Sequence, residues 1–161
     1  MFPTFSLPEH CKIVNLLAPA ADAAGRTGAY VSLKHSLKAW IKVHITQGNA
    51  ATILLSLLQA SAVAGTGSKV LVNAVPIWSN LDTATSDTLV ARTAAVNYTT
   101  DAGVALKQVI FEIDAAKLDV AGGFDCIGLS TGASNAANIT AAEILIATRY
   151  PAATPPTAVA D

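Results

Sequence analysis

The stretch Leu37-Lys-Ala-Trp-Ile-Lys-Val-His-Ile-Thr46 decides the fold class of this chain. Its odd-numbered positions are all apolar, and its even-numbered positions are polar or amphipathic. A period of two puts these two sets of side chains on opposite faces of a β-strand, whereas an amphipathic helix needs a period of about 3.6. The stretch therefore predicts a half-buried strand over 37–46, ended by the turn residues Gln47-Gly48-Asn49.

Short apolar segments separated by turn residues continue along the chain, which is typical of an all-β domain. The segment 52–58 is almost wholly apolar, which fits a strand covered on both faces and leaves a short helix open. In the strand expected over 70–78, Pro76 predicts an edge position or a bulge. Asp114 is expected to cap one helical turn over 114–118. Further strands are expected over 89–98, 107–113, 124–129 and 139–150, and a polar loop over 80–87.

About eight such strands predict an all-β fold, a two-sheet antiparallel sandwich of the jelly-roll type with one short helical turn. The 161 residues suit a single domain. Residues 1–10 are expected to form an extended N-terminal arm, and residues 11–150 the sandwich. Residues 151–161 are expected to form a Pro-rich C-terminal tail that has no core to join.

The chain is poor in charge, with 13% charged residues, 52% hydrophobic residues and a net charge of −1. Ordinary domains carry about 25% charged residues. A folded monomer of this mass exposes on the order of 7,500 Å², or roughly one charged side chain per 360 Å². Such a surface suits packing against other chains, so an oligomer or a part of a larger assembly is expected. A compact monomer with a surface of Thr, Ser and Ala is the alternative.

Composition also excludes some classes of protein. High hydrophobicity and low net charge exclude intrinsic disorder, and the balanced charge excludes a strongly basic nucleic-acid binder. No apolar run reaches the roughly 18 residues of a membrane-spanning helix, and the first residues show no secretory signal. We expect no membrane partner.

Signals for enzymatic chemistry are weak. The sequence has no nucleophile elbow, zinc-protease, phosphate-loop or dinucleotide-binding pattern. The four acids Glu112, Asp114, Asp119 and Asp125 lie close together in sequence, and paired acids would suit a glycosidase or a Ca²⁺ site. The favoured alternative has Asp114 capping its helical turn and the other three acids in solvent. The chain is therefore expected to be no enzyme and to use no cofactor, metal or small-molecule substrate.

The two cysteines, Cys11 and Cys126, lie far apart and lack the spacing of metal ligands. Cys11 is placed in a weakly structured segment and Cys126 in an apolar run. Two reduced thiols are expected, because small secreted proteins that depend on disulfides have a denser set of cysteines. A Cys11–Cys126 disulfide is the alternative.

The even-numbered residues Lys38, Trp40, Lys42 and His44 would share one face of their strand. Basic groups around an aromatic side chain can dock on an acidic protein surface with Trp40 as the anchor. They can also bind nucleic acid by phosphate contacts and stacking, or the lysines can simply cover Trp40 on a solvated face. No other segment of the chain gathers basic residues in this way, so a nucleic-acid partner is not expected and protein docking is the functional interpretation.

Four stretches together resemble a known family: Leu17–Lys34, Ala39–Gly48, Ala115–Asp125 and Ala142–Pro151. In their residue types and in their order along the chain, these stretches are similar to the small auxiliary capsid proteins of tailed bacteriophages, called decoration or cement proteins. The resemblance covers residues 11–151. It implies a β-sandwich subunit on the outside of an icosahedral head, commonly a trimer near three-fold positions, that bridges neighbouring major capsid proteins without a cofactor or catalysis.

This resemblance also implies where the chain acts and what it touches. The chain would be made in the host bacterial cytoplasm and would end on the capsid exterior, in contact with the major capsid protein and with itself. Terminal segments around Phe2, Phe5 and Pro155 would drape over neighbours, and closed cyclic symmetry makes a homotrimer natural. The alternatives are another virion part, such as a tail or head-fibre subunit, and a carbohydrate-binding or hydrolytic jelly roll.

Overall fold

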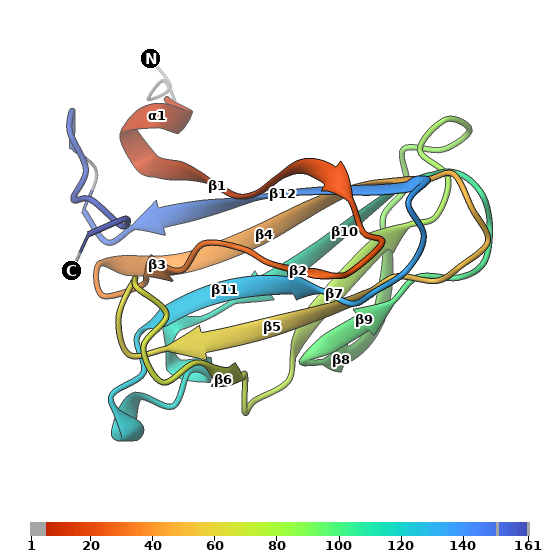
Figure 1. Cartoon of the computed structure of the whole chain (residues 1–161). Coiled ribbons are helices and arrows are strands. Elements are labelled where there is room, and N and C mark those ends of the chain that lie inside the picture. Colours follow the sequence, from red (N-terminus) through yellow and green to blue (C-terminus); the bar gives the residue numbers. More distant parts are fainter. Residues whose placement is uncertain (1–5, 151, 161) are drawn as a thin grey trace, which may run out of the picture.

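A computed structural model of the chain describes residues 6–150 and 152–160. It is a sandwich of two antiparallel sheets (Figure 1). Sheet A consists of β1 (Cys11–Ala21), β4 (Ser36–Gln47), β7 (Val75–Asn80), β8 (Val90–Ala95), β10 (Leu106–Ile113) and β12 (Asn138–Thr148). Sheet B consists of β2 (Arg26–Thr27), β3 (Val31–Ser32), β5 (Leu54–Ala60), β6 (Lys69–Val70), β9 (Asn97–Thr99) and β11 (Cys126–Thr131). The described helical segments are single turns: α1 (Leu7–His10), η1 (Ala115–Lys117) and η2 (Val120–Gly122).

The order of the strands is that of a jelly roll. Sheet A has the order β1-β12-β4-β10-β7-β8, and sheet B has the order β2-β11-β5-β6, with β3 beside β11 and β9 beside β5. The chain passes from one sheet to the other after nearly every long strand, as Greek-key connections require. The predicted all-β, two-sheet antiparallel fold is confirmed.

The alternation in β4 is confirmed over most of its length. The apolar side chains that β4 turns into the core are Ala39, Ile41, Val43 and Ile45. The exception is Leu37, which is 67% exposed, while Ser36 is buried. An irregularity in the register with β12, between Ala147 and Thr148, lies opposite this end of β4. A bulge changes which face a side chain points to, so the expected burial of Leu37 is wrong.

The core lies between the two sheets. Residues from both sheets are fully buried there, including Phe111 of β10, Ile144 of β12, Leu57 of β5 and Leu129 of β11. Each of these side chains alternates with an outward-pointing neighbour on its strand, so each sheet also presents an outer face.

Two expected strands are each divided between the two sheets. The segment expected over 70–78 forms β6 and β7, and the segment expected over 89–98 forms β8 and β9. The register of β7 with β8 shifts between Val75 and Ile77, so the bulge expected at Pro76 is confirmed. The edge position is not, because β7 lies between β10 and β8.

The helical turns differ from the expectation in their caps. Asp114 precedes η1, but its side chain makes no capping hydrogen bond, so that expectation is wrong. Asp119 precedes η2, and its carboxylate accepts a hydrogen bond from the Gly122 N–H at 3.0 Å. The cap therefore belongs to a second turn that the sequence had not indicated.

The described parts of both chain ends lie side by side (Figure 1), where the Ala152 N–H donates to the Glu9 carbonyl at 3.3 Å. Residues 152–160 contain no helix or strand, but Ala158 packs in the core, and its carbonyl accepts from the Ser32 N–H at 2.8 Å. The expectation that the tail joins no core is therefore wrong.

Cys11 and Cys126 are both buried and are not joined by a disulfide, which agrees with the two reduced thiols expected. Burial raises the pKa of the Cys11 thiol. Within the described residues, no helix has the length and apolar character needed to cross a membrane.

Candidate protein-docking surface

The four residues singled out from the sequence do share one face. Lys38, Trp40, Lys42 and His44 alternate with buried residues of β4 and point away from the core. Together with their outward neighbours on β1, β12, β10 and β7 they form a surface that we name the outer face of sheet A. β4 is a central strand that pairs with β12 on one side and β10 on the other, so its outward residues lie in the middle of this face.

The lysines of this face are paired with carboxylates. Lys38 Nζ lies 2.7 Å from Glu112 Oε2, and Lys42 Nζ lies 3.4 Å from Glu143 Oε1. Glu112 also accepts a hydrogen bond from Trp78 Nε1 at 3.1 Å. The hydrogen bond to Glu112 raises the pKa of Lys38, and its ammonium lies 5.8 Å from the centre of the Trp40 ring. The face is therefore close to neutral, although β4 alone is basic.

His44 lies farther along the same face. Gln108 of β10 and Ala141 of β12 are its direct cross-strand neighbours. Partial burial and the nearby Lys42 ammonium lower the pKa of His44, which favours the uncharged imidazole at neutral pH. His44 therefore adds a hydrogen-bonding group to the face without adding a fixed charge.

Both tryptophans of the chain lie on this face, and the sequence interpretation had included only Trp40. Trp78 of β7 lies opposite Ile110 of β10, and Trp40 lies opposite Leu145 of β12. Leu145 in turn lies opposite Ile13 of β1, which is 51% exposed. Two short apolar rows therefore lie on this face: Ile13, Leu145 and Trp40 end beside Glu112, and Trp78 and Ile110 end beside Lys42.

The sequence alone indicates only in part which residues of other strands belong to the outer face of sheet A. The alternation over 107–113 shows that Ile110 and Glu112 share a face of their strand. Nothing local shows that this strand lies beside β4, because pairing between distant strands is set by the fold.

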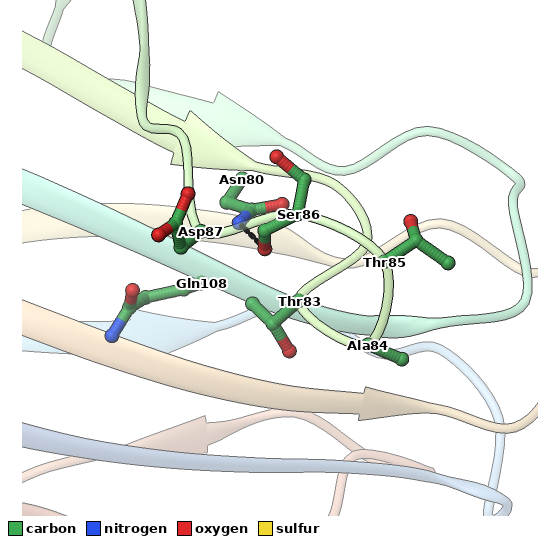
Figure 2. Close-up of a pocket in the computed structure, with 7 residues that line it drawn as sticks. All are labelled: Asn80, Thr83, Ala84, Thr85, Ser86, Asp87 and Gln108. Atoms are coloured by element: carbon green, nitrogen blue, oxygen red, sulfur yellow. Dashed lines mark hydrogen bonds between the residues drawn. The ribbon is translucent and has the colours of Figure 1, made fainter.

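An open hollow of about 590 Å³ lies beside one end of this face, under the loop 81–89 (Figure 2). Gln108 lies at its floor, and Asn80 and Thr83 lie in its wall. The Asn80 side-chain amide donates to the Ser86 carbonyl at 2.6 Å, and the Thr83 N–H donates to the Leu106 carbonyl at 2.9 Å. These bonds hold the loop in place, so the hollow extends the outer face of sheet A with a polar rim.

Three of the four acids that might have formed a catalytic pair or a Ca²⁺ site lie beside lysines. Glu112 pairs with Lys38, as described above, while Asp119 pairs with Lys69 at 2.7 Å and Asp125 with Lys34 at 3.3 Å. They are ion-paired rather than simply solvated. Across residues 6–150 and 152–160, no three His, Cys, Asp or Glu side chains are arranged to hold a metal ion.

The terminal residues named from the sequence are placed as follows. Pro155 is buried in the tail that folds back on the sandwich. Phe2 and Phe5 lie outside the described residues.

Comparisons with known proteins find distant likeness among solved structures alone. No family model matches this chain, and no curated protein matches it significantly. Among solved structures, the chain is similar to one described as the SPBc2 prophage-derived protein YomS, with a TM-score of 0.48 and 9% sequence identity. That likeness covers 85% of this chain and 93% of the other.

Proposed function

We propose that this chain is a cement subunit of a tailed-phage head, which binds the outside of the shell and stabilises contacts between major capsid proteins. The outer face of sheet A is the surface that docks. The chain acts without catalysis or a cofactor, and copies of it associate as a homotrimer. It is made in the bacterial cytoplasm and ends on the capsid exterior.

The observation that carries this proposal is the chemistry of the outer face of sheet A. Trp40 and Trp78 offer large, half-buried aromatic surfaces of the kind that dominate protein interfaces. The ion pairs Lys38–Glu112 and Lys42–Glu143 compensate one another's charge. A compensated face attracts phosphate groups weakly, since binding to nucleic acid depends on uncompensated positive charge. It suits a protein partner that contributes polar groups of both signs.

The composition and the resemblance to cement proteins support the same proposal. With 13% charged residues, the chain has a surface that favours close contact with other chains. The described part of the tail, which packs against the sandwich, leaves the central strands of sheet A uncovered.

The experiment uses heads assembled in host cells that lack this chain. Purified chain is added at a concentration below saturation, the heads are pelleted, and the bound chain is measured. Trp40→Ala and Trp78→Ala are each expected to weaken binding, because a buried tryptophan anchor is worth about 2 kcal/mol or more, or roughly thirtyfold in affinity. Val120→Ala is the matched control, because Val120 is 64% exposed on η2, outside the docking face.

Normal head binding by both tryptophan variants, with unchanged unfolding curves, would remove this face from the account. Absence of wild-type binding to heads would remove the cement function itself. Two alternative functions would be recognised by related measurements. Recovery of the chain in tails or fibres would indicate another structural part of the virion. Binding to soluble glycans, lost on changing Gln108 in the polar hollow, would indicate a carbohydrate-binding module.

A further inference from the structure

The outer face of sheet B differs chemically from that of sheet A. The strands β5, β9 and β11 contain no Asp, Glu, Lys, Arg or His. Their core-facing residues, such as Leu57 and Leu129, alternate with the residues that point outward. We name the outward set the outer face of sheet B; its main members are Tyr30, Leu54, Ser56, Leu58, Val70 and Ser130.

This face is flat at its centre and apolar at its sides. The register pairs Ser56 with Ser130, two small side chains, and Leu58 with Gly128. The Tyr30 ring covers Gly128 so closely that a Cβ there would lie 2.9 Å from it. On the far side, Leu58 lies opposite Val70, which is 50% exposed, and Leu54 is 41% exposed.

Charged groups are found at the rim of this face. Lys69 pairs with Asp119 at 2.7 Å, and its ammonium lies 4.1 Å from the centre of the Phe124 ring. The rim cation therefore already has partners in its own chain, and the interior of the face keeps no ionic group of its own.

An uncharged face is a poor contact for the surface of a different protein, because such a surface ordinarily carries charged groups. Ions on such a partner would lose water on contact and would find no counter-ion here, which is costly. A second copy of this chain brings the same uncharged face. Around a three-fold axis, one side of this face meets the other side of the neighbouring copy's face, so that contact buries apolar surface without stranding a charge. The outer face of sheet A, with its ion pairs, has the chemistry for a foreign protein instead.

We infer that copies of this chain contact one another through the outer face of sheet B, which leaves the outer face of sheet A for the host lattice. This division of the two faces deepens the proposed function, and its biological setting rests on that function. The copy–copy contact itself is a property of the purified chain and is tested without heads. A failure to self-associate is therefore distinguishable from a failure to bind heads.

The test introduces a charge of either sign at the centre of the face. Ser56→Asp and Ser56→Lys are compared with wild type by sedimentation velocity from low to high micromolar concentration. Both variants are expected to shift toward the 16.4 kDa monomer, with association weakened at least about tenfold, because either ion would be desolvated in the contact. The matched controls are Ala141→Asp and Ala141→Lys, at a half-buried position of the outer face of sheet A, and these are expected to associate as wild type does.

A second measurement needs no variant. Hydroxyl-radical footprinting of the wild-type chain at low and high concentration is expected to show protection of Tyr30 on association and no change at Trp40. The inference is overturned if the wild-type chain stays monomeric throughout, if both folded Ser56 variants associate normally, or if Trp40 rather than Tyr30 becomes protected.

Discussion

Asp22 is a carboxylate without exposed surface, and its bonds show how single residues hold the turn after β1. Arg26 Nε and Nη2 donate to Asp22 Oδ1 at 3.2 and 3.1 Å, and the Thr131 hydroxyl donates to the same oxygen at 2.9 Å. The Thr140 hydroxyl donates to the other carboxylate oxygen. The cluster joins the turn to β11 of one sheet and β12 of the other, so one residue links both layers.

Replacing Asp22 tests this link. Asp22→Ala leaves Arg26 without its carboxylate and two hydroxyls without an acceptor, and it is expected to lower the free energy of unfolding by about 3 kcal/mol. The measurement is a urea unfolding curve. Asp87→Ala, in the exposed loop 81–89, is the control and is expected to change stability by less than about 0.5 kcal/mol. Equal curves for Asp22→Ala and wild type would contradict the structural role.

The Lys107 side chain is fully buried and gives a prediction that depends on pH. Its ammonium donates to the Asp101 carboxylate and to Gln47 Oε1, the latter at 3.0 Å. The hydrogen bond from Lys107 holds the pKa of Asp101 below its usual value of 3.8. A lowered carboxyl pKa adds stability that is complete above the unfolded-state pKa and is lost as the pH falls through the folded-state pKa.

Asp101→Asn is expected to lower stability at pH 7 by about 2 kcal/mol, between the values for exposed and buried pairs, because Asp101 is half exposed while Lys107 is buried. The difference from wild type is expected to shrink as the pH falls below 3.8, because the wild-type carboxylate then becomes protonated too. Unfolding curves at pH 7 and at acid pH measure both values. A difference that stays constant with pH would show that the charge of Asp101 contributes nothing.

At the scale of whole strands, the sequence is informative where the alternation is regular. It predicts β4 and β10 closely, because β10 keeps a period of two throughout and β4 keeps it from Ala39 onward. It misses β1 (Cys11–Ala21), because no strand is expected there from the sequence and Cys11 is placed in a weakly structured segment. The register of β1 with β12 shifts twice, once on each side of Leu17, so no single period runs through the strand.

The candidate docking face shows the same limit. The residues Lys38, Trp40, Lys42 and His44 follow from the period of one strand. Trp78 and Glu112 join them only through strand pairing between distant segments, which no local pattern encodes. The faces of single strands can therefore be predicted, whereas the composition of a whole sheet face cannot.

A substitution at Gly28 tests how closely the connection between β2 and β3 approaches its neighbouring strands. Gly28 lies between β2 and β3, where the chain passes close to both β1 and β11: its N–H donates to the Leu129 carbonyl at 2.8 Å. A Cβ at Gly28 would lie 2.6 Å from the Leu16 carbonyl oxygen and 3.1 Å from that of Leu129. Gly28→Ala is therefore expected to cost about 1–3 kcal/mol by forcing backbone apart.

Thermal and urea unfolding measure this cost, with Ala29→Ser as the control, because it also adds one atom, at the neighbouring exposed position. If Gly28→Ala proves as stable as Ala29→Ser, the close approach of β1 and β11 at this connection is wrong.

For the molecule as a whole, the exposed surface of 7957 Å² is close to the roughly 7,500 Å² expected from its mass. What distinguishes it is how its few charges are arranged. The described ion pairs include two on the outer face of sheet A, while the strands β5, β9 and β11 of sheet B carry no charged residue. A jelly roll with two such different faces suits a subunit that meets two kinds of neighbour.

The most direct test of this account is a cryo-electron microscopy reconstruction of heads purified from the host that encodes this chain. The account predicts density for the sandwich on the outside of the shell, with Trp40 and Trp78 turned toward the major capsid protein. Heads that carry no such density, or that carry it with the outer face of sheet A turned to solvent, would contradict it.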